Sequence, residues 1–332
     1  MNNTGNGTLI ISLDFEMTWG GVGIWDTSGY KESNVANVRK VVARMLDLFN
    51  KYGVKATFAT VGLIMLKDKS EALNSFPDLI PSYKNNALTP FNNNYIEGIR
   101  DESLYFAPDL VSALKKNANI EVGTHTFSHY YCWEEGQTLE QFEADVRQAV
   151  NVARNNGVEL KSIIFPKNQV SADYLSVCAK YGISSYRGNA EKFYDQTSSR
   201  IKYIFNRIGR FLDSYVNIGG KTSYVLTDIK ADGEPLNLRA SRFLRPYDSR
   251  FGILDSLKIN RICNEIKYSA KHNEVYHLWW HPHNMGKNME KNFEGLERIL
   301  QCFSTCHEKY GMASCTMEEV SKSYQEEKNC TL

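Results

Sequence analysis

A joint between a helix and a strand is repeated three times in this chain. Lys-Tyr-Gly occurs at 51–53, 180–182 and 309–311, each time after a helical pattern and before a run of apolar residues. Glycine suits the left-handed position at which a helix ends, and the apolar run that follows predicts a buried strand. Repetition of this joint favours a parallel α/β fold, in which helices connect neighbouring strands.

The alternation of strand and helix patterns continues along the chain. Strands are predicted at 8–16, 54–61, 119–124, 160–165, 183–187, 275–280 and 312–316, and helices near 34–52, 108–117, 138–156, 171–181, 256–273, 291–310 and 318–328. Several of these strands are apolar almost throughout, which is typical of strands covered on both faces. Seven strands alternating with helices predict an α/β barrel that need not be perfectly closed.

Two stretches interrupt this rhythm. Residues 67–107 contain a run rich in Asn and Pro, and residues 189–254 form a longer segment of mixed character. No linker divides the chain, so we expect one barrel domain over 1–332, with insertions at about 67–107 and 189–254 that lie over one end of the barrel.

The composition excludes several classes of protein. The 332 residues are 42% apolar and carry a net charge of +1, which gives no electrostatic case for a nucleic acid or an anionic membrane as partner. No apolar run approaches the roughly 20 residues of a membrane span. The N-terminal residues do not resemble a signal peptide, so we expect a cytoplasmic protein.

Polar residues gather where the predicted strands end, which is where parallel barrels carry their functional groups. The first strand ends with Asp14 and Glu16, two residues apart and therefore on one face. The third is followed by His125 and His129, and later strands are followed by the polar runs Pro-Lys-Asn, Arg-Gly-Asn and His-Pro-His-Asn. This convergence predicts an active site.

The two histidines are four residues apart, at His125 and His129. Both imidazoles can point at one metal ion if His129 lies in the first turn of a helix, and a nearby carboxylate would complete a three-ligand site with a position open for water. The alternative is that one or both are ordinary histidines bonded to the backbone.

Asp14 and Glu16 face the same way from an otherwise apolar strand, which is costly unless a cation or basic groups face them. A metal ion meets this need, with one carboxylate as ligand and the other free as a base. A salt-bridged pair, helix N-caps or the acid pair of a glycosidase are alternatives, but the glycosidase interpretation leaves the histidines unexplained.

Three more histidines lie in and after the strand at 275–280. His277 lies within the strand and is interpreted as structural. His281 ends the strand before a proline, where a catalytic acid would be presented, and His283 and Asn284 follow as candidate substrate-binding residues.

Tryptophans near these strand ends are candidates for stacking on a sugar ring. They are Trp19 and Trp25 after the first strand and Trp280 before His281. The alternative for each of them is packing in the core or in a loop.

Taken in order, these motifs resemble those of the polysaccharide deacetylases with NodB homology (carbohydrate esterase family four). The run Ser-Leu-Asp-Phe-Glu at 12–16 resembles the acidic first motif, His-Thr-Phe-Ser-His at 125–129 matches the second motif in full, and Leu-Trp-Trp-His at 278–281 resembles the fifth. The resemblance covers nearly the whole chain outside the two insertions. It implies a distorted (β/α)7-type barrel.

The resemblance also implies roles for these residues. It implies a divalent metal, most often zinc, held by His125, His129 and an acidic residue that maps to Glu16. The catalytic base maps to Asp14, and the general acid maps to His281. Because the acidic pair is Asp-x-Glu and not two adjacent aspartates, the roles of Asp14 and Glu16 could be exchanged.

The third motif departs from the family. The backbone N–H of the residue after its proline, here Lys167, maps to the donor that binds the oxyanion. Ile164 stands where the family normally has an arginine that pairs with the base. We hypothesise that Arg187, at the end of the next strand, supplies that charge to Asp14.

The expected activity is metal-dependent hydrolysis of an N-acyl group, acetyl or formyl, on a sugar. Without an export signal, we expect the substrate to be a saccharide or a nucleotide- or lipid-linked precursor used in cell-surface polysaccharide biosynthesis. Candidates for binding its anionic groups are Arg200, Arg207, Arg210, Arg239, Arg242 and Arg245 in the second insertion; the alternative for each is a solvated surface arginine. A metal-independent amidase acting on a small cyclic amide or ureido compound, or a catalytically silent glycan-binding relative, are the alternatives.

Overall fold

The computed structural model describes residues 6–25, 29–92, 94–189, 213, 215, 219–226 and 235–331. The strands in these residues are β1 (Thr8–Phe15), β2 (Ala56–Thr60), β3 (Ile120–Thr124), β4 (Ser162–Ile163), β5 (Ser185–Tyr186), β6 (Leu236–Asn237), β7 (Arg242–Phe243), β8 (Val275–Trp280) and β9 (Ala313–Cys315). The helices are α1 (Tyr30–Ser33), α2 (Val38–Tyr52), α3 (Lys69–Leu73), α4 (Pro108–Lys116), α5 (Leu139–Asn155), α6 (Ala172–Lys180), α8 (Gly252–His272), α9 (Met289–Tyr310) and α10 (Met317–Thr331).

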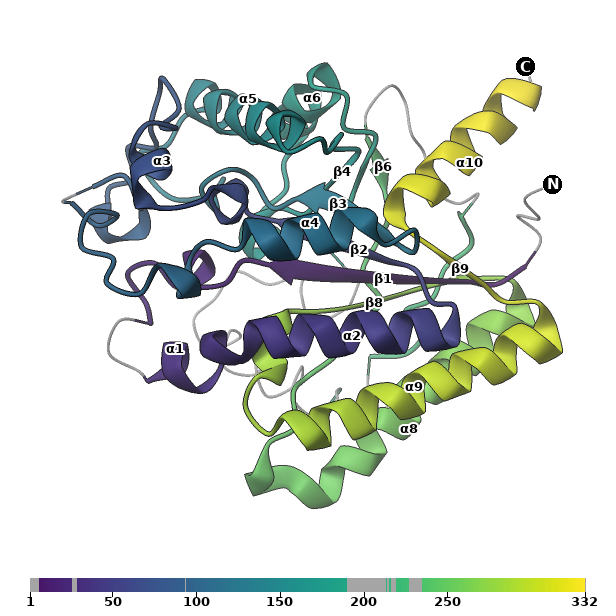
Figure 1. The fold of residues 1–332 in the computed structure, drawn as a ribbon. Helices are drawn as coiled ribbons and strands as arrows, with labels where there is room; N and C mark the ends of the chain where they lie inside the picture. The colour runs from purple at the N-terminus through teal and green to yellow at the C-terminus, as the bar shows by residue number, and fades with distance from the viewer. Residues whose placement is uncertain are drawn as a thin grey trace.

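The strands form one curled parallel sheet in the order β6-β5-β4-β3-β2-β1-β8-β7, and β9 pairs with the first half of β1. Helices α2, α8 and α9 lie along one side of this sheet, and α5 and α6 lie along the opposite side (Figure 1). The distorted α/β barrel predicted from the sequence is confirmed.

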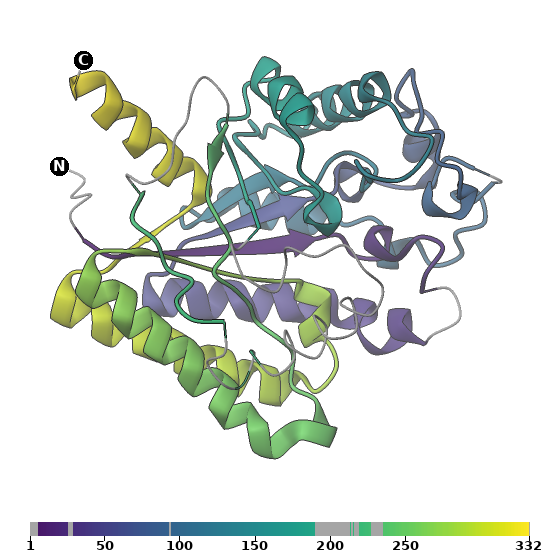
Figure 2. The ribbon, with the colours of Figure 1, turned by 180° about the vertical axis from the view of Figure 1, so that it is seen from behind.

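The stretch at 236–244 connects the two ends of the sheet. Its first half bonds to the strand β5 side, where Leu238 N–H donates to the Tyr186 carbonyl over 2.8 Å, and its second half bonds to β8, where Leu244 N–H donates to the Trp279 carbonyl over 2.8 Å. Seen from behind, the chain continues from this stretch to α8 (Figure 2). Among the described residues, the barrel wall therefore has seven strand positions, which we call staves: β1 to β5, residues 236–244 and β8.

The identity of the seventh stave corrects the sequence-based expectation. The strand predicted at 312–316 is present as β9, but it pairs with the first half of β1 and lies off the main strand order. The stave at 236–244 was not predicted, because Arg239 and Arg242 interrupt its apolar residues and because it falls within the expected insertion.

The three Lys-Tyr-Gly joints have the expected geometry. Gly53, Gly182 and Gly311 have φ values of 61°, 81° and 70°, in the left-handed region where a side chain would be strained. Strands β2 and β9 begin within three residues of the first and last of these glycines. The joint therefore ends a helix, and the next strand begins two or three residues further along.

Successive residues of β1 face two different environments. Ile11 and Leu13 pack with the surrounding helices in the main apolar core, whereas Ile10 belongs to a separate apolar cluster in the barrel interior. Ser12 and Asp14 continue the row of Ile10, since alternate residues of a strand share a face. The interior of the barrel thus changes from apolar to polar toward the C-terminal end of β1.

Both expected insertions contain structure. Residues 67–107 include α3 and short 3₁₀ turns. The second insertion is described only in part, and Arg200, Arg207 and Arg210 lie outside the described residues. Among the helices that the structure describes, none has the length and apolar character needed to cross a membrane.

Candidate active site

Four of the candidate residues occupy the same position relative to a strand. Glu16, His125, Arg187 and His281 are each the first residue after β1, β3, β5 and β8, respectively. The C-terminal ends of parallel strands meet at one end of a barrel, so this position brings the four side chains together. Asp14 precedes them within β1 and faces the interior.

Asp14 is paired with Arg187 inside the barrel. The guanidinium Nη1 and Nη2 donate to the two carboxylate oxygens over 2.6 and 2.8 Å. Arg187 is fully buried, also donates to Ser12 Oγ and Asn168 Oδ1, and stacks 4.0 Å from the ring centre of Trp279. Burial acts to raise the pKa of Asp14, but the charge of Arg187 outweighs it with help from nearby groups and holds the pKa below its usual value. Asp14 is therefore ionised at neutral pH.

Glu16 lies against the two histidines of the 125–129 motif. Its Oε2 is 2.8 Å from His129 Nε2 and 3.4 Å from His125 Nε2. One ligand atom from each of the three residues lies within 4.8 Å of the others. His125 Nδ1 is 2.7 Å from the Ile164 carbonyl oxygen, which fixes the ring so that Nε2 faces Glu16.

The protonation states of this cluster suit a metal ion. Burial acts to raise the pKa of Glu16, but in acid the protonated forms of His281 and His129, together with hydrogen bonds from His125 and His129, hold it well below its usual value. Burial lowers the pKa of His129, so this imidazole is neutral at pH 7. An ionised carboxylate with two imidazoles, one of them bonded through its other nitrogen to a carbonyl, is a typical zinc-binding donor set.

The segment that carries the two histidines is a loop and not the helical turn expected from the sequence. Thr126 and His129 have φ values of 64° and 62°, in the left-handed region. Asp145 of α5 stabilises this shape by accepting from Phe127 N–H over 2.7 Å and from Ser128 N–H over 3.2 Å, and it also accepts from the Ser128 hydroxyl. The two imidazole rings are therefore brought together by a loop that Asp145 stabilises, and not by the spacing of a helical turn.

Asp145 is a site-supporting residue that was missed in the sequence. It is fully buried, and burial raises its pKa to about 6. The available signal was its place on the apolar face of α5, among the buried Phe142, Val146 and Ala149. An acidic residue in such a row must find donors, because an unpaired buried carboxylate is costly.

His281 faces both carboxylates from the loop after β8. Its Nε2 is 3.6 Å from Asp14 Oδ2 and 3.5 Å from Glu16 Oε1. On the other side of the ring, Nδ1 lies 3.2 Å from Asn284 Nδ2, and Asn284 Oδ1 accepts a hydrogen bond of 2.6 Å from the Tyr30 hydroxyl. The ring is thus bonded through Nδ1, and Nε2 faces the two carboxylates.

His283 and Trp25 border the same centre. His283 Nε2 is 3.7 Å from Glu16 Oε1, and burial lowers the pKa of His283 to about 3, so it is neutral. Trp25 and Tyr30 pack edge-on against its ring, at 5.0 and 5.6 Å between ring centres. His277, in contrast, bonds to Ser12 Oγ and the Leu238 carbonyl inside the barrel, in agreement with a structural role.

Two of the candidate tryptophans do not reach the site. Trp19 is 1% exposed and donates from Nε1 to the Tyr105 carbonyl, and Trp280 is fully buried against Phe49. The tryptophan that faces the site from β8 is Trp279, whose ring centre is 5.7 Å from that of His281. Alternation along the strand explains this, because His281 and Trp279 share the inner face and Trp280 points to the helices.

Lys167 lies in the turn after β4. Its φ is 54°, and its neighbour Asn168, which bonds to Arg187, has a φ of 53°. The Lys167 side chain turns toward the rim, where Nζ pairs with Glu134 over 3.0 Å and lies 3.9 Å from the ring centre of Tyr131. The backbone of Lys167 thus lies next to a residue that contacts Arg187, whereas its ammonium group pairs with Glu134 at the rim.

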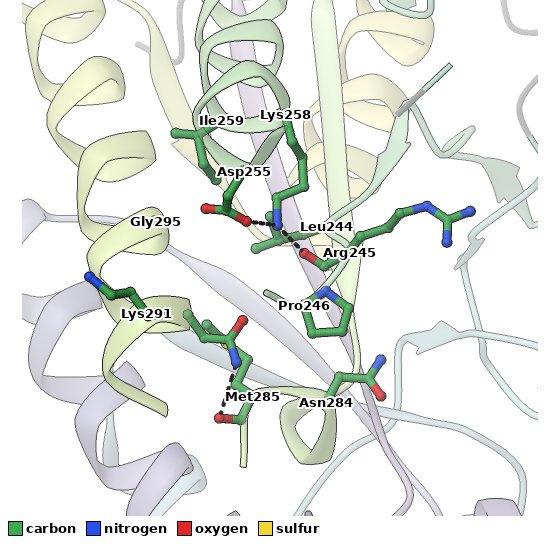
Figure 3. A pocket seen from close by; sticks show the side chains of 11 residues that line it. Leu244, Arg245, Pro246, Asp255, Lys258, Ile259, Asn284, Met285, Lys291 and Gly295 are labelled. Atoms are coloured by element: carbon green, nitrogen blue, oxygen red, sulfur yellow. Dashed lines mark hydrogen bonds and ion pairs between the residues drawn. The ribbon is translucent and has the colours of Figure 1, made fainter. Parts of the chain in front are cut away.

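A small cavity lies between α8, α9 and residues 244–246, beside the loop that carries Asn284 (Figure 3). Its volume is about 10 Å³, close to that of a single water-sized probe, so it is too small for a substrate. Lys258 lines it and donates to Asp255 over 2.6 Å and to the Arg245 carbonyl over 2.8 Å.

Comparisons with known proteins bear on this geometry. Residues 28–186 match a family model described as polysaccharide deacetylase. This range includes His125 and His129, whereas Asp14, Glu16 and His281 lie outside it. No curated protein matches the chain.

Solved structures match over almost the whole chain. A protein from Mycobacterium smegmatis assigned as a polysaccharide deacetylase has a TM-score of 0.62 at 11% identity, covering 98% of this chain and 92% of its own. The PuuE allantoinase has a TM-score of 0.58 at 10% identity, covering 98% and 92%. A second assigned deacetylase, from Pseudomonas aeruginosa PAO1, has a TM-score of 0.55 at 11% identity, covering 98% and 93%. At such low identity these matches establish the fold.

Residues 28–186, just under half of the chain, thus resemble the polysaccharide deacetylases, and the chain as a whole has the fold of solved structures assigned to that family.

Proposed function

We propose that this protein is a metal-dependent hydrolase that removes an N-acyl group, acetyl or formyl, from a sugar. The observation that carries the proposal is the cluster of Glu16, His125 and His129, whose ligand atoms lie within 4.8 Å of one another. An ionised carboxylate and a histidine lie directly beside this cluster, at Asp14 and His281. Together these groups provide a metal site, a base and an acid at one barrel end.

Glu16, His125 and His129 would hold the ion, and zinc fits this donor set best. A divalent ion bound there would supply Lewis acidity, which polarises the acyl carbonyl and lowers the pKa of water. The three protein donors leave room for other ligands, as catalytic sites require. Because Glu16 contacts both histidines and Asp14 is bound to Arg187 instead, we assign the ligand role to Glu16 and the base role to Asp14.

Asp14 accepts the proton of the attacking water in this proposal. The two bonds from Arg187 keep its carboxylate ionised and fix its orientation. Each carboxylate oxygen retains a second acceptor position for the water proton. Arg187 therefore takes the part that the family gives to the arginine of the third motif, which is replaced here by Ile164.

His281 protonates the departing amine from Nε2, and its ring is oriented through Asn284. The backbone N–H of Lys167 stabilises the negative charge that develops on the acyl oxygen. Trp25 and His283 bound the space beside the ligand cluster and contact the substrate. Together these groups give each stage of amide hydrolysis a protein donor or acceptor.

For the biological substrate we propose a saccharide or saccharide precursor of cell-surface polysaccharide biosynthesis. The support is the family match and the resemblance of the motifs.

The proposal is tested by metal analysis and turnover on the same preparations. Wild type and Asp14→Asn should each bind about one zinc per chain, and His129→Ala should bind none, because His129 is a proposed ligand and Asp14 is not. Release of acetate from oligomers of N-acetylglucosamine should be lost in both variants, by roughly 10²-fold or more for Asp14→Asn. A wild type that takes up no zinc would rule out the metal-dependent mechanism.

A metal-independent amidase is the second candidate, supported by the similarity in fold to the PuuE allantoinase. Activity on a cyclic ureido compound that survives removal of metal by a chelator would favour it. A catalytically silent glycan-binding protein is the third candidate, and any turnover that depends on Asp14 would exclude it.

A further inference from the structure

Trp133 is unusually exposed for its residue type. Its side chain is 60% exposed, although the three residues before it, Tyr130, Tyr131 and Cys132, are all buried. All five tryptophans of the chain lie in the described residues, and the other four are buried or partly buried. An exposed indole leaves a large apolar surface in water, which favours a binding role when the residue is held in place.

The backbone around Trp133 is held firmly in the absence of regular secondary structure. Tyr131 N–H donates to the Tyr83 hydroxyl over 2.8 Å, and Trp133 N–H donates to Gln169 Oε1 over 3.1 Å. The carbonyl between them accepts from Gln137 Nε2 over 2.7 Å. Side chains from three other segments therefore fix this part of the chain, so the indole is presented from a rigid support.

This support connects Trp133 to the candidate active site. Gln169 ends the turn after β4 that contains Lys167, and Lys167 pairs with Glu134, the residue after the tryptophan. The ammonium of Lys167 lies over the ring of Tyr131, whose centre is 5.0 Å from that of His129. A path of side chains thus leads from the ligand cluster, past Tyr131 and the Lys167–Glu134 pair, to the rim that carries Trp133.

We propose that Trp133 is a stacking platform for a second sugar ring, so that the substrate is a glycan of at least two sugars and not a free monosaccharide. The inference rests on the proposed function and names the substrate class of the same site. A pyranose ring has an apolar face of C–H groups that packs on an indole, and its hydroxyls can bond to Lys167 and Glu134 beside it. Because the support is rigid, little conformational entropy is lost when the sugar binds.

The test compares substrates of two lengths in matched variants. The substrates are N-acetylglucosamine and its β-1,4-linked pentamer. The variants are Trp133→Leu, which removes the ring, Trp133→Phe, which keeps an aromatic ring, and Ile253→Ala as a control. Ile253 is 95% exposed on α8, so its truncation should leave kcat and KM unchanged for both substrates.

For Trp133→Leu we expect KM for the pentamer to rise about three- to tenfold, which corresponds to the loss of one aromatic stacking contact. The kcat for the pentamer and both constants for the monosaccharide should stay at the wild-type values. Trp133→Phe should recover most of the loss. Equal effects on both substrates, or no effect on either, would overturn the proposal.

A binding measurement separates failure of the proposal from failure of the proposed function. Acrylamide quenching of tryptophan fluorescence reports mainly on the exposed indole, and the pentamer should reduce it in wild type but not in Trp133→Leu. If neither substrate is hydrolysed but this protection is observed, the stacking platform stands and the hydrolase proposal fails. If hydrolysis occurs without protection, the platform is refuted and the hydrolase stands.

Discussion

The pairing of Arg187 with Asp14 leads to a prediction in which stability and pH are linked. Replacing Arg187 by methionine keeps an unbranched side chain of similar length in the barrel but removes the charge. The Asp14 carboxylate would then be buried without its two bonds from the guanidinium. Ser12 and Asn168 would also lose a donor.

The size of the effect follows from the burial of both partners. Arg187 is 0% exposed and Asp14 is 4% exposed, so water screens the pair little. Removing one partner of a buried ion pair costs about 3 to 5 kcal/mol of the free energy of unfolding. With an unfolding entropy of about 2.1 cal/mol/K per residue over the 332 residues, this lowers Tm by about 4 to 7 °C.

The sign of the pH dependence differs between the two proteins. In wild type the pKa of Asp14 is lowered, so its contribution to stability is present above its unfolded pKa and is lost only as pH falls through the lower folded value. Without Arg187, burial raises the pKa of Asp14, and protonation in mild acid relieves the penalty. The stability difference between wild type and Arg187→Met should therefore be largest at pH 7 and should shrink toward pH 4.

Urea unfolding at several pH values measures this difference, and the double variant Arg187→Met/Asp14→Asn is the control. The double variant should recover most of the loss at pH 7, because it contains no uncompensated charge. Turnover should fall in the single variant while zinc content is unchanged, since neither residue is a proposed ligand. A stability difference that is the same at pH 4 and pH 7 would refute the reasoning.

Two further predictions concern the supports of the ligand cluster. Burial raises the pKa of Asp145 to about 6 from an ordinary value of 3.8, so its stabilising contribution is full below the unfolded pKa and is lost as pH rises through 6. Relative to Asp145→Asn, the free energy of unfolding of wild type in urea should rise by about 2.5 kcal/mol from pH 8 to pH 4. Parallel pH curves for the two proteins would argue against this. A Cβ at Gly20 would overlap the Glu16 carboxyl group, whereas at Gly98 the nearest atoms are 3.4 Å away. Gly20→Ala should weaken zinc binding by about 10- to 100-fold in a chelator competition and Gly98→Ala should not. Equal affinities would contradict the view that this glycine keeps Glu16 in its ligand position.

The parts of the fold that were predictable are those encoded by local pattern. The Lys-Tyr-Gly joints and the apolar strands gave the alternation, and the polar residues at strand ends gave the candidate site. The geometric link between Arg187 and Asp14 was also expected, because strand ends in a barrel converge.

The parts that were missed depend on contacts between distant segments. The loop at 125–129 takes its shape from Asp145, sixteen or more residues further along, so the spacing of the two histidines alone suggested a helical turn. Trp280 was placed at the site although strand alternation excludes it: if His281 faces inward, Trp279 must do so and Trp280 cannot. The stave at 236–244 has no uninterrupted apolar run, and its two halves pair with different neighbours, so no local pattern marks it as one strand.

That divided stave has a consequence for synthesis of the protein on the ribosome. Strands β1 to β5 emerge first as a sheet with two open edges, because β5 bonds to 236–238 and β1 bonds to β8, both made later. Open strand edges pair readily with other chains. A truncated protein ending near residue 187 would keep both edges open, so the nascent chain stays prone to aggregation until about residue 280 has left the exit tunnel.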